Sequence, residues 1–169
     1  SPDELGELAG EADAPGFVLL AGFEYTSTCG DILVYGLHAC QVSTFEPFMD
    51  PGEALAAFRE HGAACVAAHP TRAGMGFDTN IRDLPFDAIE VQSVNMLPHE
   101  QRMALSLAQN LGLRPMAASD AHRLADIGAY HTELEVPVQT MAHLQEALRH
   151  GKFRITALGG RHSPRKERV

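Results

Sequence analysis

The fold class is decided by the stretch MAASDAHR at residues 116–123, in which a strand-like apolar run stops at Asp120 and His122. Both side chains are of types that bind divalent metal ions. A strand that ends at such residues is typical of α/β folds, which place their chemistry at the strand ends of a parallel sheet. The stretch therefore predicts an α/β domain with a metal site at one edge of its sheet.

Three upstream apolar runs also end at a candidate ligand. They are residues 17–23 before Glu24, residues 32–37 before His38, and residues 64–68 before His69. Because neighbouring parallel strands lie about 4.8 Å apart, side chains that leave them at one edge can share an ion. The mixture of imidazole and carboxylate groups favours Zn²⁺, Mn²⁺ or Fe²⁺ over Ca²⁺.

Strand and helix signals alternate along the rest of the chain. Asp50 and Pro51 predict the start of a helix that ends near residue 61. Apolar residues recur at helical spacing in 98–111 and 139–150, and further strands are expected at 88–91, 114–118, 128–136 and 153–158. The Gly-rich stretch 71–85 is a candidate active-site loop. This alternation predicts a mostly parallel sheet with helices outside it.

Composition and charge restrict the organisation and the partners. With 169 residues, one domain over 1–160 and a flexible basic tail at 161–169 are expected. The net charge of −9 argues against binding to nucleic acid, and no apolar run approaches the roughly 20 residues of a membrane span. Three cysteines without two-residue spacing suggest no disulfide framework. A cytoplasmic protein is expected.

In their order and spacing, these motifs resemble the later motifs of the PHP (polymerase and histidinol phosphatase) superfamily. The stretches are GFE at 22–24, GLH at 36–38, AHP at 68–70 and SDAHR at 119–123. The resemblance implies a distorted (β/α)7 barrel, of which this chain supplies the later strands and helices. The family's opening Asp-x-His-x-His motif does not occur before Glu24. We therefore expect that this chain lacks the first βα units, and that its partners include a missing N-terminal segment or further copies in an oligomer.

The resemblance also implies a ligand set for two or three divalent ions, namely Zn, Mn or Fe. Glu24 would be the bridging carboxylate, and His38 and His69 would complete one site with it. Asp120 and His122 would be divided between the other ions. Glu24 and Asp120 are thus the candidate catalytic residues.

The activity that this resemblance implies is hydrolysis of a phosphomonoester or small phosphodiester by metal-activated hydroxide. The substrate would be a phosphorylated small molecule or a nucleotide. Arg72 and Arg123 each follow a candidate ligand closely, and a guanidinium group can fork onto phosphate oxygens.

Each candidate also has a structural interpretation. A single histidine or carboxylate could simply be a hydrogen-bonded strand end, and Glu90 could either orient a ligand or make a structural hydrogen bond. Arg72 and Arg123 could instead form ion pairs; the acidic partners considered are Asp78, Asp83 and Asp126. The alternative function is a non-catalytic metal-binding or scaffold domain, or an accessory domain of a nucleic-acid enzyme.

Overall fold

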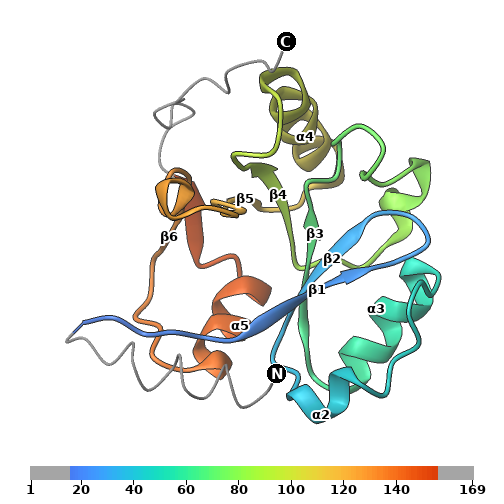
Figure 1. Cartoon of the computed structure of the whole chain (residues 1–169), viewed down its shortest axis with the longest axis vertical. Coiled ribbons are helices and arrows are strands. Elements are labelled where there is room, and N and C mark those ends of the chain that lie inside the picture. The colour runs from blue at the N-terminus through green and yellow to red at the C-terminus, as the bar shows by residue number, and fades with distance from the viewer. Residues whose placement is uncertain (1–15, 156–169) are drawn as a thin grey trace.

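The structure is a computed structural model that describes residues 16–155, and its largest element is a five-stranded sheet (Figure 1). The strands lie in chain order: β1 (Gly22–Thr26), β2 (Asp31–Tyr35), β3 (Ala64–Ala68), β4 (Ala88–Gln92) and β5 (Pro115–Ala117). A second, two-stranded sheet pairs β6 (Thr132–Leu134) with β7 (Phe153–Ile155). The expected α/β class is confirmed.

Four α-helices occur in the described part of the chain. They are α2 (Ala39–Val42), α3 (Pro51–Glu60), α4 (Pro98–Leu111) and α5 (Met141–Arg149), with short 3-10 turns η1 (Thr79–Asp83) and η2 (Leu124–Asp126). Asp50 caps α3 because its carboxylate accepts the N–H groups of Gly52 and Glu53 at 2.8 and 3.3 Å. None of the helices within 16–155 has both the length and the apolar character needed to cross a membrane.

The direction of β1 and β2 differs from the expected parallel arrangement. β1 pairs with β2 antiparallel, β2 pairs with β3 antiparallel, and only the β3–β4 and β4–β5 pairs are parallel. The connection between β1 and β2 is only residues 27–30, whereas a parallel crossover needs about a dozen residues or more. These strands therefore form a hairpin, and Glu24 lies inside β1 rather than beyond its end.

No closed barrel is formed by the described residues, so the expected (β/α)7 barrel is not confirmed. The sheet is open, with β1 at one edge and β5 at the other. The expected tail at 161–169 lies outside the described residues, and so do the ends of the expected domain at 1–15 and 156–160.

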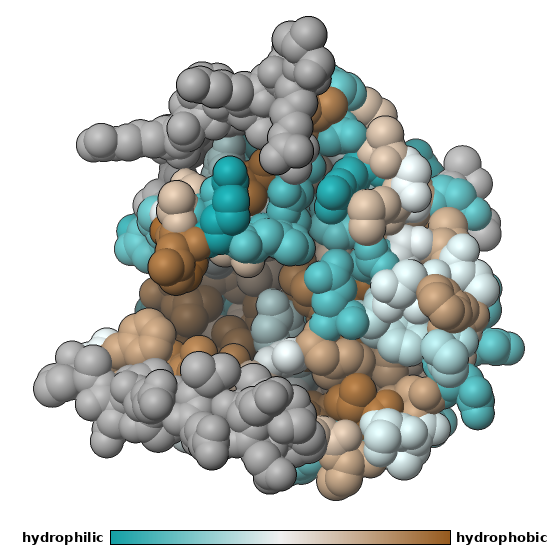
Figure 2. Space-filling view, viewed as in Figure 1, coloured by the Kyte–Doolittle hydropathy of each residue, from teal (hydrophilic) through white to brown (hydrophobic). Residues whose placement is uncertain are grey.

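The two faces of the sheet are covered by different helices. Alternate residues of β3 point to opposite faces: Cys65 packs in the core with α3 and α4, while Val66 packs with Leu148 of α5. The register places Glu24 opposite Leu33, which lies opposite Val66, so Glu24 shares the α5 face. Figure 2 shows a hollow lined mainly by apolar residues between the start of β1 and the β5–β6 region.

Candidate metal centre

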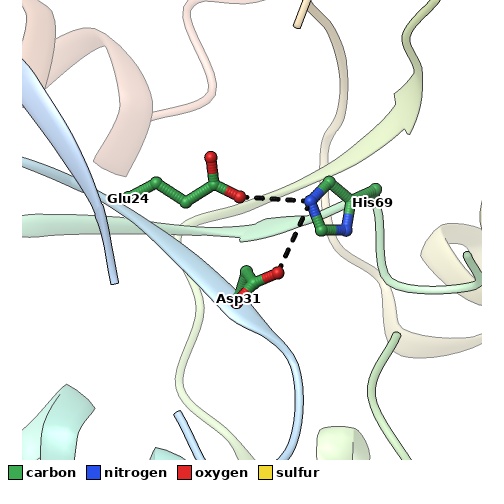
Figure 3. A group of neighbouring side chains, drawn as sticks. All are labelled: Glu24, Asp31 and His69. Carbon is green, nitrogen blue, oxygen red and sulfur yellow. Dashed lines mark hydrogen bonds and ion pairs between the residues drawn. The ribbon is translucent and has the colours of Figure 1, made fainter. Parts of the chain in front are cut away.

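Glu24, Asp31 and His69 bring three candidate ligand atoms together (Figure 3). Nε2 of His69 lies 3.1 Å from Oε1 of Glu24 and 3.7 Å from Oδ2 of Asp31. All three ligand atoms lie within 4.8 Å of one another. In the part of the chain that the structure describes, this is the only such group of three histidine, cysteine or acidic side chains.

The sheet register explains why these side chains meet. Asp31 is the first residue of β2 and pairs with Thr26, two residues after Glu24, so the two carboxylates are diagonal neighbours on one face. Asp31 also pairs with Ala68, and His69 follows Ala68 directly at the end of β3. The short hairpin therefore delivers both acids to the histidine.

The backbone at His69 is unusual. Its φ is 27°, in a region that residues with a Cβ rarely adopt. The N–H of His69 donates to Oε2 of Glu90 at 2.7 Å, and the side chain is 4% exposed. This buried hydrogen bond helps to hold a conformation that the isolated chain would disfavour.

The site shifts the pKa values of its own groups. The hydrogen bond from His69 lowers the pKa of Glu24 in spite of partial burial. Burial by itself would lower the pKa of His69, but the hydrogen bond to Glu24 and the charges of Glu90, Glu24 and Asp31 together raise it. Glu24 and His69 thus stabilise each other as an ion pair.

Glu90 is a buried carboxyl group beside this pair. It lies in β4 on the same face as Ala88, which belongs to the α5-side cluster. Burial raises the pKa of Glu90 to about 7, although its hydrogen bond from His69 acts in the opposite direction. Of the two roles considered for Glu90, the structure shows the structural hydrogen bond, because Glu90 accepts from the backbone of His69 and not from its imidazole.

Asp120 and His122 form a second cluster after β5. Nδ1 of His122 lies 3.1 Å from the carbonyl oxygen of Asp120 and 3.8 Å from its Oδ1. Asp120 is 17% exposed, whereas His122 is 76% exposed. The charge of His122 helps to lower the pKa of Glu24, and the charge of Asp120 helps to raise the pKa of Glu90. The two clusters therefore interact electrostatically.

His38 is not brought to either cluster. It is exposed and caps α2, where its N–H donates to Oε1 of Gln41 at 2.8 Å. Because β2 runs antiparallel to β3, His38 follows the end of β2 that pairs with Ala64, whereas His69 follows the other end of β3. The β2 strand alone separates these ends by about 14 Å. Asp31 occupies the position beside His69 that was expected for His38.

The two arginines have different environments. Arg72 is partly buried, and its charge helps to lower the pKa of Glu24. Arg123 forks onto Asp126, with Nε and Nη2 donating to the two carboxylate oxygens at 2.9 and 2.8 Å. The ion-pair interpretation considered for Arg123 is therefore present in the structure.

The loop after His69 is tied to α4. Glu100 accepts the N–H of Ala73 at 2.8 Å and that of Leu97 at 2.7 Å, and Thr71 donates to the Glu100 carbonyl at 2.7 Å. These bonds fix the segment that carries Arg72. The expected 71–85 loop is thus anchored close to the site at its first residues.

Two further residues were missed by sequence reasoning. Asp31 starts a strand instead of ending one, and its only signal was its place directly after Gly30 in a short turn. Asn95 donates from Nδ2 to Oδ2 of Asp120 at 2.6 Å. An asparagine three residues beyond a strand gives no signal of this contact in the sequence.

Comparison with solved structures shows similarity to larger proteins. PsfC from Pseudomonas syringae is 20% identical with a TM-score of 0.59, and the match covers 78% of this chain and 66% of that one. At this identity the likeness concerns the fold. No curated protein matches the chain.

Two other solved structures are similar over less of the fold. A candidate metal-dependent phosphoesterase from Bifidobacterium adolescentis is 23% identical with a TM-score of 0.41, covering 47% of this chain and 30% of that one. An amidohydrolase from Chromobacterium violaceum, with bound sulfate and no metal, is 25% identical with a TM-score of 0.42, covering 68% and 41%. The chain thus spans less than two thirds of each of the three proteins.

A family model matches the C-terminal part of the chain. The model described as PHP-associated matches residues 98–153, which run from α4 to the start of β7 and include Asp120 and His122. This is the superfamily that the ordered motifs resemble. The C-terminal part of the chain therefore carries a PHP-associated region.

Proposed function

We propose that the chain is part of a metal-dependent phosphoesterase in which Glu24, Asp31 and His69 hold one divalent ion. The observation that carries this proposal is the convergence of their ligand atoms within 4.8 Å. Two ligands bound to one ion at about 2.1 Å are themselves about 3 to 3.5 Å apart; the contact of 3.1 Å lies in this range and the contact of 3.7 Å slightly beyond it. Two carboxylates and an imidazole suit Zn²⁺, Mn²⁺ or Fe²⁺.

A bound ion would lower the pKa of a coordinated water and polarise a phosphoryl oxygen. The protein itself supplies the enclosure and the charge. His69 and Asp31 are buried, whereas the Glu24 side chain is 43% exposed, so the group is open to solvent on the side of Glu24. A substrate would therefore approach past Glu24.

Further ligands and substrate contacts are proposed from the neighbouring cluster. Asp120 and His122 act electrostatically on Glu90 and Glu24, which supports a role in holding additional ions of the same centre. Arg72 is our candidate for binding the phosphate of a phosphomonoester or small phosphodiester. Arg123 could do so only after leaving Asp126.

The test measures ions and hydrolysis separately. The chain is stripped with a chelator, dialysed against Zn²⁺, Mn²⁺ or Fe²⁺, and analysed for ions per chain. Hydrolysis is then followed with p-nitrophenyl phosphate and its diester. His69→Ala and Asp120→Asn should lose ions and turnover, whereas His99→Ala, an exposed residue of α4, should lose neither.

The outcomes separate the candidate functions. Binding of an ion without hydrolysis of either ester would favour the non-catalytic metal-binding domain. Unchanged ion content in both site variants would contradict the proposed centre.

A further inference from the structure

The side-chain amide of Asn95 joins Asp120 to His122. Its Nδ2 lies 2.8 Å from the carbonyl oxygen of Asp120, 2.6 Å from Oδ2 of Asp120 and 3.3 Å from Nδ1 of His122. Asn95 follows β4, and the residues that it contacts lie 25 and 27 positions further along the chain. One amide group therefore touches both candidate ligands of the second cluster.

The number of hydrogens on the Asn95 amide determines its orientation. An asparagine NH₂ group has two hydrogens, and the two Asp120 oxygens accept both. The reverse orientation would place the amide oxygen against two acceptor oxygens. No hydrogen of Nδ2 then remains for His122.

The donation of both Asn95 hydrogens to Asp120 also determines which nitrogen of His122 carries the hydrogen. Since Asn95 has no hydrogen to offer, Nδ1 of His122 is left to donate its own to the Asp120 carbonyl oxygen at 3.1 Å. The neutral ring then has its lone pair on Nε2. Because the His122 side chain is 76% exposed, this lone pair is available to a ligand from solvent.

The backbone of this segment also depends on the contact. Asp120 has a φ of 48°, in the left-handed region, and its side chain must keep one oxygen on Asn95. Val94, next to Asn95, donates its N–H to the Ser119 carbonyl at 3.2 Å. Residues 94 and 95 thus hold the strained turn at two successive positions.

From this geometry we infer that Asn95 is a positioning residue that fixes the Asp120 carboxylate and the Nδ1–H tautomer of His122. It thereby prepares both residues to bind a divalent cation, an inference whose metal-binding part depends on the proposed function. In metal sites a neutral histidine binds through one nitrogen while the other donates a hydrogen bond, and His122 already has this arrangement.

The first test reads the tautomer directly. Long-range ¹H–¹⁵N spectra of the metal-free chain at about pH 8.5, where an ordinary imidazole is neutral, distinguish Nδ1–H from Nε2–H. The wild type should show mainly Nδ1–H at His122. Asn95→Ala should shift His122 toward Nε2–H, the tautomer that free histidine prefers, and Asn110→Ala, on the exposed part of α4, should not.

The second test measures zinc binding by calorimetry. Asn95→Ala should weaken binding by about tenfold, as loss of a supporting hydrogen bond around a metal does. In the background of Asp120→Ala combined with His122→Ala, the same substitution should have no further effect, because Asn95 acts only through those two residues.

The outcomes distinguish this inference from a purely structural role. A wild-type spectrum dominated by Nε2–H would overturn it even if Asn95→Ala did not fold. A lower melting temperature of Asn95→Ala with unchanged tautomer and zinc affinity would also overturn it. If the wild type binds no ion, the proposed function fails, and the tautomer measurement still decides the role of Asn95.

Discussion

Oδ2 of Asp31 lies 3.7 Å from Nε2 of His69, and this contact joins the first residue of β2 to the residue that follows β3. Both side chains are nearly fully buried, at 6% and 4% exposed. A buried carboxylate beside an imidazole is stable only when a proton or a cation neutralises it. The site therefore favours binding of either a proton or a metal cation.

Asp31→Asn should weaken binding of Zn²⁺ by at least about tenfold, because a neutral amide replaces a charged ligand. Calorimetry on the stripped chain measures this effect. The control is Asp83→Asn, the same substitution at an exposed acid of η1, and it should bind zinc as the wild type does. Equal affinity in the two variants would remove Asp31 from the site.

Zinc affinity should increase as the pH rises through the raised pKa of His69. The metal needs the Nε2 lone pair, and the charged ring must lose its proton first. Glu24→Gln replaces the charged acceptor of the His69 hydrogen bond by a neutral amide and should move the titration of His69 to lower pH, as followed by NMR. An unchanged titration of His69 in this variant would show that the contact is absent in solution.

The pair should also affect the stability of the metal-free chain. A histidine with a raised pKa in the fold stabilises it fully below its unfolded value of 6.5, and this contribution is lost as the pH rises through the folded pKa. Denaturation with urea across this range measures the loss. In His69→Gln, the free energy of unfolding should change less with pH over this range.

Glu90→Gln should make the metal-free chain more stable at pH 8 but not at pH 4. The folded chain keeps the Glu90 proton up to about pH 7, while the unfolded chain loses it near 4.5. The free energy of unfolding of the wild type therefore falls between these values, by an amount on the order of 3 kcal/mol. Equal stability of the two proteins at both pH values would show that Glu90 is hydrated rather than buried.

Phe58→Ala should destabilise the fold by about 3 to 5 kcal/mol. Phe58 is fully buried, and its ring makes edge-to-face contacts with Phe23, Tyr25 and Phe45 at 4.9 to 5.9 Å between centroids. Urea denaturation measures the loss. A value below about 1 kcal/mol would mean that α3 does not pack on the β1–β2 hairpin in this way.

Gly30→Ala should cost more stability than Gly62→Ala. Both glycines have positive φ, at 86° and 79°, but an added Cβ at Gly30 would lie 2.6 Å from the ring of Phe77, whereas at Gly62 it meets open space. The conformational strain of about 1 kcal/mol is common to both, and the clash adds about 1 to 3 kcal/mol at Gly30. Comparison of their melting temperatures isolates the clash, and equal values would contradict it.

Much of the fold was readable because local signals agreed with the tertiary structure. The apolar run at 64–68 is β3, and the helix from Pro98 to Leu111 ends at Gly112, whose φ is 68°. In β3 the signal is a short run of apolar residues, and in α4 it is helical spacing followed by a glycine. The direction of β2 was also readable, since residues 27–30 are too few for a parallel crossover. The sequence prediction took β2 as parallel, and for that reason it placed His38 at the site.

The rest of the site could not be read from strand ends. Glu24 faces the centre from the middle of β1, and Asp31 reaches it through a diagonal cross-strand contact that depends on register. Asn95 acts through a hydrogen bond across 25 residues of sequence. Such contacts are set by packing between distant segments, and no local pattern of residues encodes them.

The left-handed backbone at His69 and Asp120 stores conformational strain at two candidate ligands. Glycine would relieve this strain, but it would also remove the hydrogen bond of His69 to Glu24 and that of Asp120 to Asn95. Engineering of this protein should therefore hold both positions constant and seek its gains elsewhere.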